Sequence, residues 1–148
     1  MSYFDGTQST SVAELKRPLV LVVDDDEGIR DALREILEDA GFATVDARDG
    51  LEALKLLGKL TSAPTFILLD LTMPVMDGWA FCESRGRSRT LSEIPVIAIS
   101  ADDLSEGERP EGIDAFLSKP IDVDKFARLA IRMAALCSLR ARRNKRPH

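Results

Sequence analysis

The chain has 148 residues, of which 45% are hydrophobic and 30% charged, as in an ordinary globular protein of one domain. The net charge is −5, and because residues 140–148 alone contribute +5, residues 1–139 carry −10. No apolar run approaches the roughly 18–20 residues that span a bilayer. The first 18 residues also lack the apolar core of a signal peptide. We therefore expect a protein without a membrane span.

The scarcity of histidine and cysteine excludes several kinds of site. The sole histidine, His148, is the last residue, so a Ser-His-Asp triad and a histidine metal cluster are not expected. Cys82 and Cys137 are not spaced as a metal-binding pair, and two packed thiols suit the reducing cytoplasm. The sequence contains neither G-x-x-x-x-G-K-[ST] nor G-x-G-x-x-G, so no nucleotide-phosphate loop is indicated. We expect a cytoplasmic protein.

Short apolar runs alternate with helical patterns along the chain. Residues 1–17 are polar and predict a flexible arm. Strands are predicted at 19–23, 42–47, 65–70, 94–99 and 115–117. Helical spacing of apolar residues follows each of the first three strands, at 29–40, 51–57 and 79–86, and returns after the fifth strand at 126–137.

This alternation predicts an α/β fold with a doubly wound, five-stranded parallel sheet and helices on both faces. Residues 101–112 are an exception, because Gly107 and Pro110 interrupt the expected helix and a proline inside a helix costs about 3 kcal/mol. We therefore predict that this fourth helix is short or irregular. The predicted domain covers residues 18–139 and is followed by a basic tail at 140–148.

Polar side chains follow the carboxyl ends of four predicted strands. In chain order they are Asp24, Asp25, Asp26, Asp70, Ser100 and Lys119. Open α/β sheets bind ligands at this edge. Neighbouring carboxylates repel one another, and Mg²⁺ relieves the repulsion by binding one or two of them. A lysine and a hydroxyl beside them suit phosphoryl oxygens. The arrangement indicates phosphoryl transfer to a carboxylate nucleophile, Asp70.

Each of these residues also has a simpler interpretation. The acidic run at 24–26 can be merely an acidic N-cap for the following helix, with no role in a site. Ser100 can cap a strand end, and Lys119 can be a solvated surface residue. The basic tail can end a solvated helix or contact nucleic acid, an anionic membrane or an acidic partner.

Four motifs together resemble a known family. They are VVDDD at 22–26, LDLTMPVMDG at 69–78, ISA at 99–101 and LSKP at 117–120. In this order at successive strand ends, they resemble the receiver domain of two-component response regulators across residues 18–139. The resemblance implies a flavodoxin-like sheet with strand order 2-1-3-4-5.

The resemblance also implies a role for individual residues. Asp70 would be the phosphoacceptor and Mg²⁺ ligand, Asp25 a direct Mg²⁺ ligand and Asp24 a ligand through water. The backbone carbonyl of Thr72 would complete the protein ligands of Mg²⁺. Lys119 would contact the phosphoryl oxygens, and the peptide bond that follows it is expected to be cis.

By the same resemblance, the chain is a signalling switch rather than a multiple-turnover enzyme. A histidine kinase or histidine phosphotransfer protein would phosphorylate Asp70, because the chain has no internal histidine donor. Ser100 and Phe116 would then shift the face formed by residues 101–112, the fifth strand and the last helix toward a downstream effector. Phe116 stands where the family has an aromatic switch residue, although it can also be plain core.

The chain length predicts a stand-alone receiver without a DNA-binding domain, and leaves open whether phosphorylation produces a homodimer. Two alternatives remain. The chain can be a phosphorelay intermediate that passes phosphate from Asp70 to another histidine. It can also be a phosphatase similar to the haloacid dehalogenases, whose D-x-D nucleophile motif is formally matched by Asp24 and Asp26.

Overall fold

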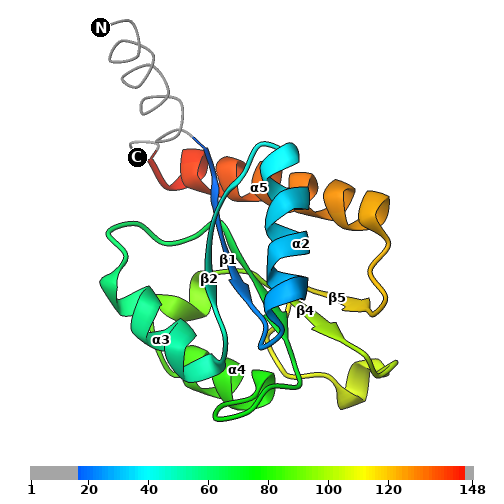
Figure 1. Ribbon diagram of the computed structural model, residues 1–148. Coiled ribbons are helices and arrows are strands. Elements are labelled where there is room, and N and C mark those ends of the chain that lie inside the picture. Colours follow the sequence, from blue (N-terminus) through cyan, green and yellow to red (C-terminus); the bar gives the residue numbers. More distant parts are fainter. Residues whose placement is uncertain (1–16, 146–148) are drawn as a thin grey trace, which may run out of the picture.

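The computed structural model of the protein describes residues 17–145 and shows one parallel sheet of five strands (Figure 1). The strands are β1 (Leu19–Val23), β2 (Ala43–Ala47), β3 (Phe66–Asp70), β4 (Val96–Ser100) and β5 (Ala115–Ser118). Their order across the sheet is β2-β1-β3-β4-β5, and every neighbouring pair is parallel. The predicted α/β fold and strand order are confirmed.

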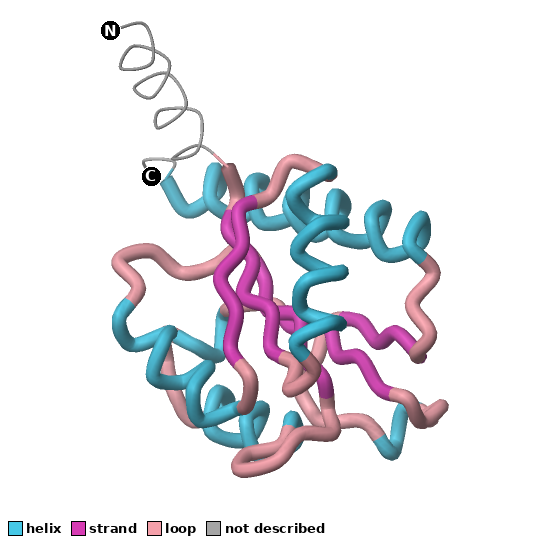
Figure 2. The backbone as a smooth tube through the Cα atoms, viewed as in Figure 1, coloured by secondary structure: helices cyan, strands magenta, loops and turns pink. Residues whose placement is uncertain are grey.

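Helices cover both faces of the sheet, as Figure 2 shows. They are α2 (Glu27–Asp39), α3 (Gly50–Lys59), α4 (Gly78–Gly86) and α5 (Val123–Lys145). The helices α3 and α4 pack on one face, and α2 and α5 on the other. No helix among residues 17–145 is long and apolar enough to cross a membrane.

The central strand β3 supplies both layers of the core. Phe66 and Leu68 pack with residues of α2 and α5, whereas Ile67 and Leu69 pack with residues of α3 and α4. This alternation follows from the two-residue repeat of a strand, and both sets are buried because helices cover both faces. All five residues of β3 are buried, so Asp70 extends from a rigid support.

The segment 101–112 contains no α-helix. Its regular structure is a single 3-10 turn at Glu106–Glu108, and Pro110 is buried just after it. The prediction of a short or irregular fourth helix is confirmed. Its physical reason is that a proline removes a backbone donor and clashes with the preceding helical turn.

The last helix is longer than the sequence pattern predicts. It begins at Val123 and ends at Lys145, whereas apolar spacing marks only residues 126–137. The predicted boundary between domain and tail at 139/140 therefore falls inside α5. Residues 1–16 of the predicted arm and residues 146–148 of the predicted tail lie outside the described residues.

Candidate functional site

Three acidic side chains meet where β1 and β3 end. The two strands are paired with Val23 opposite Leu69, so the next residues, Asp24 and Asp70, lie side by side. Carboxylate oxygens of Asp24, Asp25 and Asp70 all lie within 4.8 Å of one another. Asp24 and Asp70 are only 1% and 4% exposed, whereas Asp25 faces solvent. The predicted convergence of these residues is observed.

The turn after β1 is fixed by its own hydrogen bonds. The backbone N–H of Asp26 donates to Oδ1 of Asp24 over 2.9 Å, and the Asp26 carboxylate accepts from Ile29 N over 3.1 Å. Arg30 Nη1 also donates to the backbone carbonyl of Asp24 over 2.7 Å. The N-cap interpretation therefore applies to Asp26, while Asp24 and Asp25 face the site. No sequence pattern indicated the contribution of Arg30, which depends on the local path of the turn.

Lys119 reaches the same cluster from the end of β5. Its Nζ lies 3.4 Å from Oδ2 of Asp24 and 3.5 Å from Oδ1 of Asp70. Its backbone N–H donates to the carbonyl of Ser100 over 2.8 Å, which anchors this loop to β4. The following bond, Lys119-Pro120, is cis, as the resemblance implies. Lys119 is thus a partly buried ion-pair partner rather than a freely solvated lysine.

The environment of Asp70 raises the pKa of its carboxyl group to about 6. Burial is the largest cause, and the charge of Asp24 and, more weakly, that of Asp25 act in the same direction. The Lys119 ammonium group and the Thr72 backbone N–H favour the ionised form. Asp70 is therefore mainly ionised at neutral pH, at an energetic cost that a nearby cation would remove.

This donor set fits a divalent cation. Three carboxylates face one ammonium group, so the cluster is negatively charged even after Lys119 is counted. Hard cations such as Mg²⁺ prefer oxygen ligands and use one or two carboxylates. The combination of two buried carboxylates and an exposed one could therefore hold Mg²⁺ while leaving one side open to solvent.

The loop after β3 keeps its backbone close to Asp70. Thr72 N donates to Oδ1 of Asp70 over 3.3 Å, while the Thr72 side chain is exposed. Further along, Val75 has φ 68°, a strained value for a β-branched residue, and it lies in the tight turn closed by Met76 N and the Pro74 carbonyl. The loop then folds back so closely that a Cβ on Gly78 would lie 2.7 Å from the Cα of Leu71. The role of the Thr72 carbonyl as a metal ligand stays a prediction.

The two predicted switch residues, Ser100 and Phe116, lie in β4 and β5, on the side of β3 away from β1. Ser100 is 1% exposed, and its Oγ accepts a hydrogen bond from Asp102 N over 3.0 Å. Phe116 is half-buried against the apolar cluster of the α3–α4 face. The Arg109 guanidinium carbon lies 4.2 Å from the centre of its ring. Sequence reasoning missed Arg109 because stacking between a loop and a distant strand leaves no periodic signal.

An apolar groove adjoins Lys119. It has a volume of about 550 Å³ and lies between the first turns of α2 and the loop that leads into α5. Its walls are mainly aliphatic, from Gly28, Ile29, Ala32, Leu33, Ile36, Lys119, Pro120, Ile121 and Val123. The groove therefore joins an apolar surface directly to the charged cluster.

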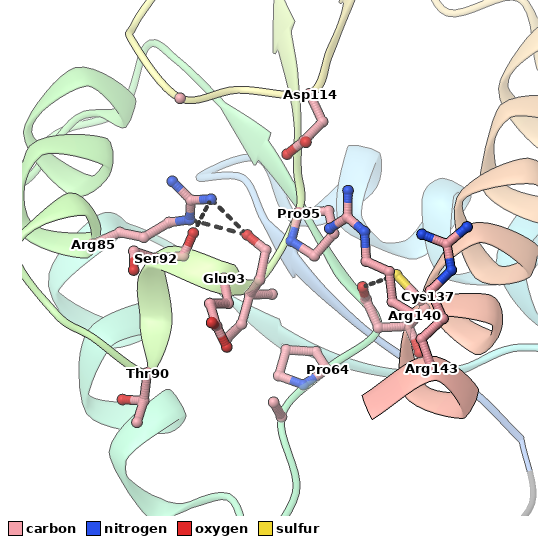
Figure 3. A pocket seen from close by; sticks show the side chains of 14 residues that line it. Pro64, Arg85, Thr90, Ser92, Glu93, Pro95, Asp114, Cys137, Arg140 and Arg143 are labelled. Carbon is pink, nitrogen blue, oxygen red and sulfur yellow. Dashed lines mark hydrogen bonds between the residues drawn. The ribbon is translucent and has the colours of Figure 1, made fainter. Parts of the chain in front are cut away.

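A separate cavity of about 620 Å³ lies at the opposite, amino-terminal edge of the sheet (Figure 3). It contains none of the predicted site residues. On its wall, Arg85 is only 4% exposed and donates to the carbonyl oxygens of Ile94 and Ser92. Arg85 thus holds the loop before β4 against α4. Cys137 Sγ contacts the Thr65 carbonyl over 3.2 Å, and burial raises the pKa of this thiol, as expected of a packed cysteine.

Comparison with known proteins gives one consistent family. The model of the response regulator receiver domain matches residues 20–130. The response regulator MprA of Mycobacterium sp. (strain KMS) is 37% identical over 121 residues, which cover 79% of this chain and 49% of that protein. The DNA-binding dual master transcriptional regulator RpaA of Synechocystis sp. is 35% identical over 113 residues, or 74% of this chain and 46% of that protein. The chain spans about half the length of the curated relatives it matches.

Solved structures give the same result. The receiver domain of the Francisella response regulator 1452 is 35% identical, with a TM-score of 0.68, and the match covers 82% of this chain and 98% of that one. The chemotaxis response regulator CheY4 of Vibrio cholerae is 27% identical, with a TM-score of 0.72 and coverage of 80% and 99%. Both neighbours therefore share the fold of this chain over most of its length.

Proposed function

Since the chain belongs to the family of response regulator receiver domains of two-component systems, we propose that it is a switch that accepts a phosphoryl group on Asp70 from a partner phosphohistidine. The observation that carries this proposal is the buried carboxylate of Asp70, held between two further acids and Lys119 at the end of the central strand. This set of residues suits phosphoryl transfer to a carboxylate.

In the transfer step, a carboxylate oxygen of Asp70 attacks phosphorus and a new O–P bond forms. The P–N bond of the phosphohistidine breaks, and its electron pair stays on the imidazole nitrogen. Lys119 Nζ, 3.5 Å from Oδ1 of Asp70, is placed to offset the charge of the phosphoryl oxygens. Asp25, Asp70 and the Thr72 carbonyl would hold Mg²⁺, with Asp24 acting through water. Bound there, Mg²⁺ supplies positive charge that lowers the repulsion between the carboxylates and the phosphoryl group.

The apolar groove beside Lys119 supports the arrival of the phosphoryl group on a partner protein. Its aliphatic lining from α2 and from residues 120–123 suits the apolar face of a helix, and the charged cluster lies at its end. A helix seated there would bring a phosphohistidine next to Asp70. We propose a histidine kinase or a histidine phosphotransfer protein as this partner.

Phosphorylation adds roughly −1.5 to −2 charges at pH 7 at a site that is already acidic. Ser100 and Phe116 would convert this change into a shift of the face formed by residues 101–112, β5 and α5, to which a downstream effector binds. The chain would act through this partner and would not turn over a metabolic substrate. Rapid return of the phosphoryl group to a phosphotransfer protein would instead identify a phosphorelay intermediate.

The proposal is tested by incubating the protein with acetyl phosphate and Mg²⁺ and measuring incorporated phosphoryl groups by intact-protein mass spectrometry. We expect one group per chain, lost in Asp70→Asn because an amide is not a nucleophile. Asp26→Asn is the matched control, since asparagine also caps a helix and the side chain at position 26 lies outside the cluster. Equal labelling of the Asp70→Asn protein would contradict the assignment, and steady turnover of phosphomonoesters would favour the phosphatase.

A further inference from the structure

Side chains hold the segment 101–112 in place. At its start, Asp102 N donates to Oγ of Ser100, which follows Ile99, the residue paired with Asp70 on the neighbouring strand. In its middle, the side chains and backbone of Ser105 and Glu108 bond to each other around the 3-10 turn. Because a segment without an α-helix has few backbone bonds of its own, these side-chain contacts determine where it lies.

At the end of the segment, Arg109 joins it to β5. The Arg109 guanidinium carbon lies 4.2 Å from the centre of the Phe116 ring, and its Nε donates to the Leu104 carbonyl over 2.9 Å. The guanidinium therefore bridges the start of the segment and the strand. Within residues 17–145, it makes no ion pair with a carboxylate, although Glu106 and Glu108 are close in sequence. Within this part of the chain, no ion pair with a carboxylate therefore competes with the Phe116 ring for the Arg109 guanidinium.

The cation–π contact between Arg109 and Phe116, called the Arg109–Phe116 stack below, forms on a ring that is only half-buried. Phe116 packs against the same apolar cluster as Leu104 and Ile113, and the guanidinium of Arg109 lies over its face. A cation over an aromatic face is attracted by the ring and more strongly when both are shielded from water. Arg109 and Phe116 are both half-buried, so the contact is shielded in part.

From this geometry we propose that the Arg109–Phe116 stack stabilises the resting conformation of the switch, so that phosphorylation has to displace Arg109 from the ring. The inference rests on the proposed function, because it concerns how Asp70 controls the output face. Arg109 is a positioning residue in this scheme: it acts through Phe116 and residues 101–112 and does not contact the phosphoryl group.

The path to Arg109 begins at Ser100, which follows Ile99, the strand partner of Asp70, and it continues through two hydrogen bonds seen in the structure. If the Ser100 hydroxyl turns toward a phosphoryl group on Asp70, Asp102 N loses its acceptor and the start of the segment is released. Leu104, which accepts from Arg109 Nε, lies two residues further on. A shift of the Leu104 carbonyl therefore moves the guanidinium, and the Phe116 ring is then free to change its position. A ligand favours whichever state it binds better, so weakening the resting state should strengthen binding to the active state.

The test uses beryllium fluoride, which forms a tetrahedral adduct on an aspartate carboxylate and thereby mimics a phosphoryl group. Its affinity for the full chain with Mg²⁺ is measured by calorimetry for the wild type, Arg109→Ala, Arg109→Lys and Phe116→Leu, and for the double variant Arg109→Ala/Phe116→Leu. Arg89→Ala is the matched control, because Arg89 is an exposed arginine before β4, at the opposite edge of the sheet. Thermal unfolding confirms that each variant is folded.

We expect Arg109→Ala to bind beryllium fluoride about two- to fivefold more tightly than the wild type, the range given by a partly shielded cation–π contact. Arg109→Lys should lie between the two, since it keeps the charge and loses the planar group. Arg89→Ala should match the wild type. In the Phe116→Leu background, Arg109→Ala should have no further effect, because the ring on which it acts is gone.

Three other results would contradict the proposal. Unchanged or weaker binding by Arg109→Ala overturns the stack as a resting-state contact. An equal effect of Arg109→Ala in the presence and absence of the Phe116 ring shows that Arg109 acts elsewhere, and also overturns it. Failure of the wild type to bind beryllium fluoride would overturn the proposed function and the inference with it. Normal binding by the wild type, together with unchanged binding by Arg109→Ala, would overturn the inference alone.

Discussion

Two regions of the same sheet edge differ in how firmly they are built. At the ends of β1 and β3, the acidic residues follow strands whose inner residues are fully buried, and the turn into α2 is fixed by an N-cap and by Arg30. At the ends of β4 and β5, the chain continues into residues 101–112, which contain one 3-10 turn. The first region holds its side chains in a fixed arrangement, and the second can rearrange without unfolding a helix.

The difference agrees with what each region has to do in the proposed function. A nucleophile, its metal ligands and Lys119 must hold their mutual geometry during the transfer, so rigid strands are a suitable support. A switch needs two conformations that differ by only a few kcal/mol, and segments of low local stability provide them. In β5, an edge strand of four residues, Ala115 and Phe116 are only half-buried.

The same contrast separates two arginines. Arg85 is 4% exposed and donates to two backbone carbonyls, so its guanidinium is part of the fixed structure at the amino-terminal edge of the sheet. Arg109 is half-buried and its side chain makes one such bond, and its guanidinium also lies over the face of Phe116. Burial and the number of hydrogen bonds thus distinguish a structural arginine from one that can be displaced.

The largest effect should come from breaking the rigid region at its proposed metal ligands. Asp25→Ala removes an exposed carboxylate from the cluster while leaving the strand and the helix cap intact. We expect Mg²⁺ affinity to fall by more than about 10-fold, since even residues that only support a metal ligand cost that much. Titration of the protein with Mg²⁺ by calorimetry measures the change. Asp26→Asn serves as the control, and an Asp25→Ala protein that binds Mg²⁺ as the wild type does would exclude Asp25 as a ligand.

A smaller effect concerns the cost of placing charge in this region. Because the pKa of folded Asp70 is raised from 3.8 to about 6, the folded state binds more protons than the unfolded state between these values. Stability should therefore fall as the pH rises through this window and stay lower above it. Without Mg²⁺ at neutral pH, Asp70→Asn should be more stable than the wild type, with a gain on the order of 1 kcal/mol in the free energy of unfolding.

Urea unfolding at neutral pH and at about pH 4 measures this gain, which should shrink strongly at the lower pH because folded Asp70 is then neutral and its unfolded carboxyl, with a pKa of 3.8, is only about half ionised. Saturating Mg²⁺ should also reduce the difference, since the metal stabilises only the protein that binds it. A gain that is the same at both pH values would mean that the charge of Asp70 is not its cause.

Much of the rigid region could be predicted from the sequence. Apolar runs such as 19–23 and 65–70 identify buried parallel strands, and the rule that their carboxyl ends share one edge brings Asp24, Asp25, Asp70 and Lys119 together. The irregular segment was also predictable, because Gly107 and Pro110 carry a local energetic cost that does not depend on the rest of the fold.

Other features depend on contacts between distant residues and leave no local pattern. Arg109 and Phe116 meet because the segment folds back on β5, and Arg30 meets the Asp24 carbonyl because of the path of the turn. The apolar spacing ends before α5 does, for a different reason, and the interpretation of the basic tail as the end of a solvated helix agrees with the structure up to Lys145. Apart from Ala141, the last residues of α5, Arg140 to Lys145, are polar and so show no apolar spacing, yet arginine, lysine and alanine are good helix formers and the next proline is Pro147.

The division between a fixed site and a movable segment is tested most directly by hydrogen exchange of the full chain with Mg²⁺, in the presence and absence of beryllium fluoride. We expect the adduct to change exchange mainly at residues 101–118, with little change in the already protected strands β1 and β3. Arg109→Ala should show faster exchange at 101–112 before beryllium fluoride is added. A response confined to α2 and α3, with residues 101–118 unchanged, would contradict the proposed division.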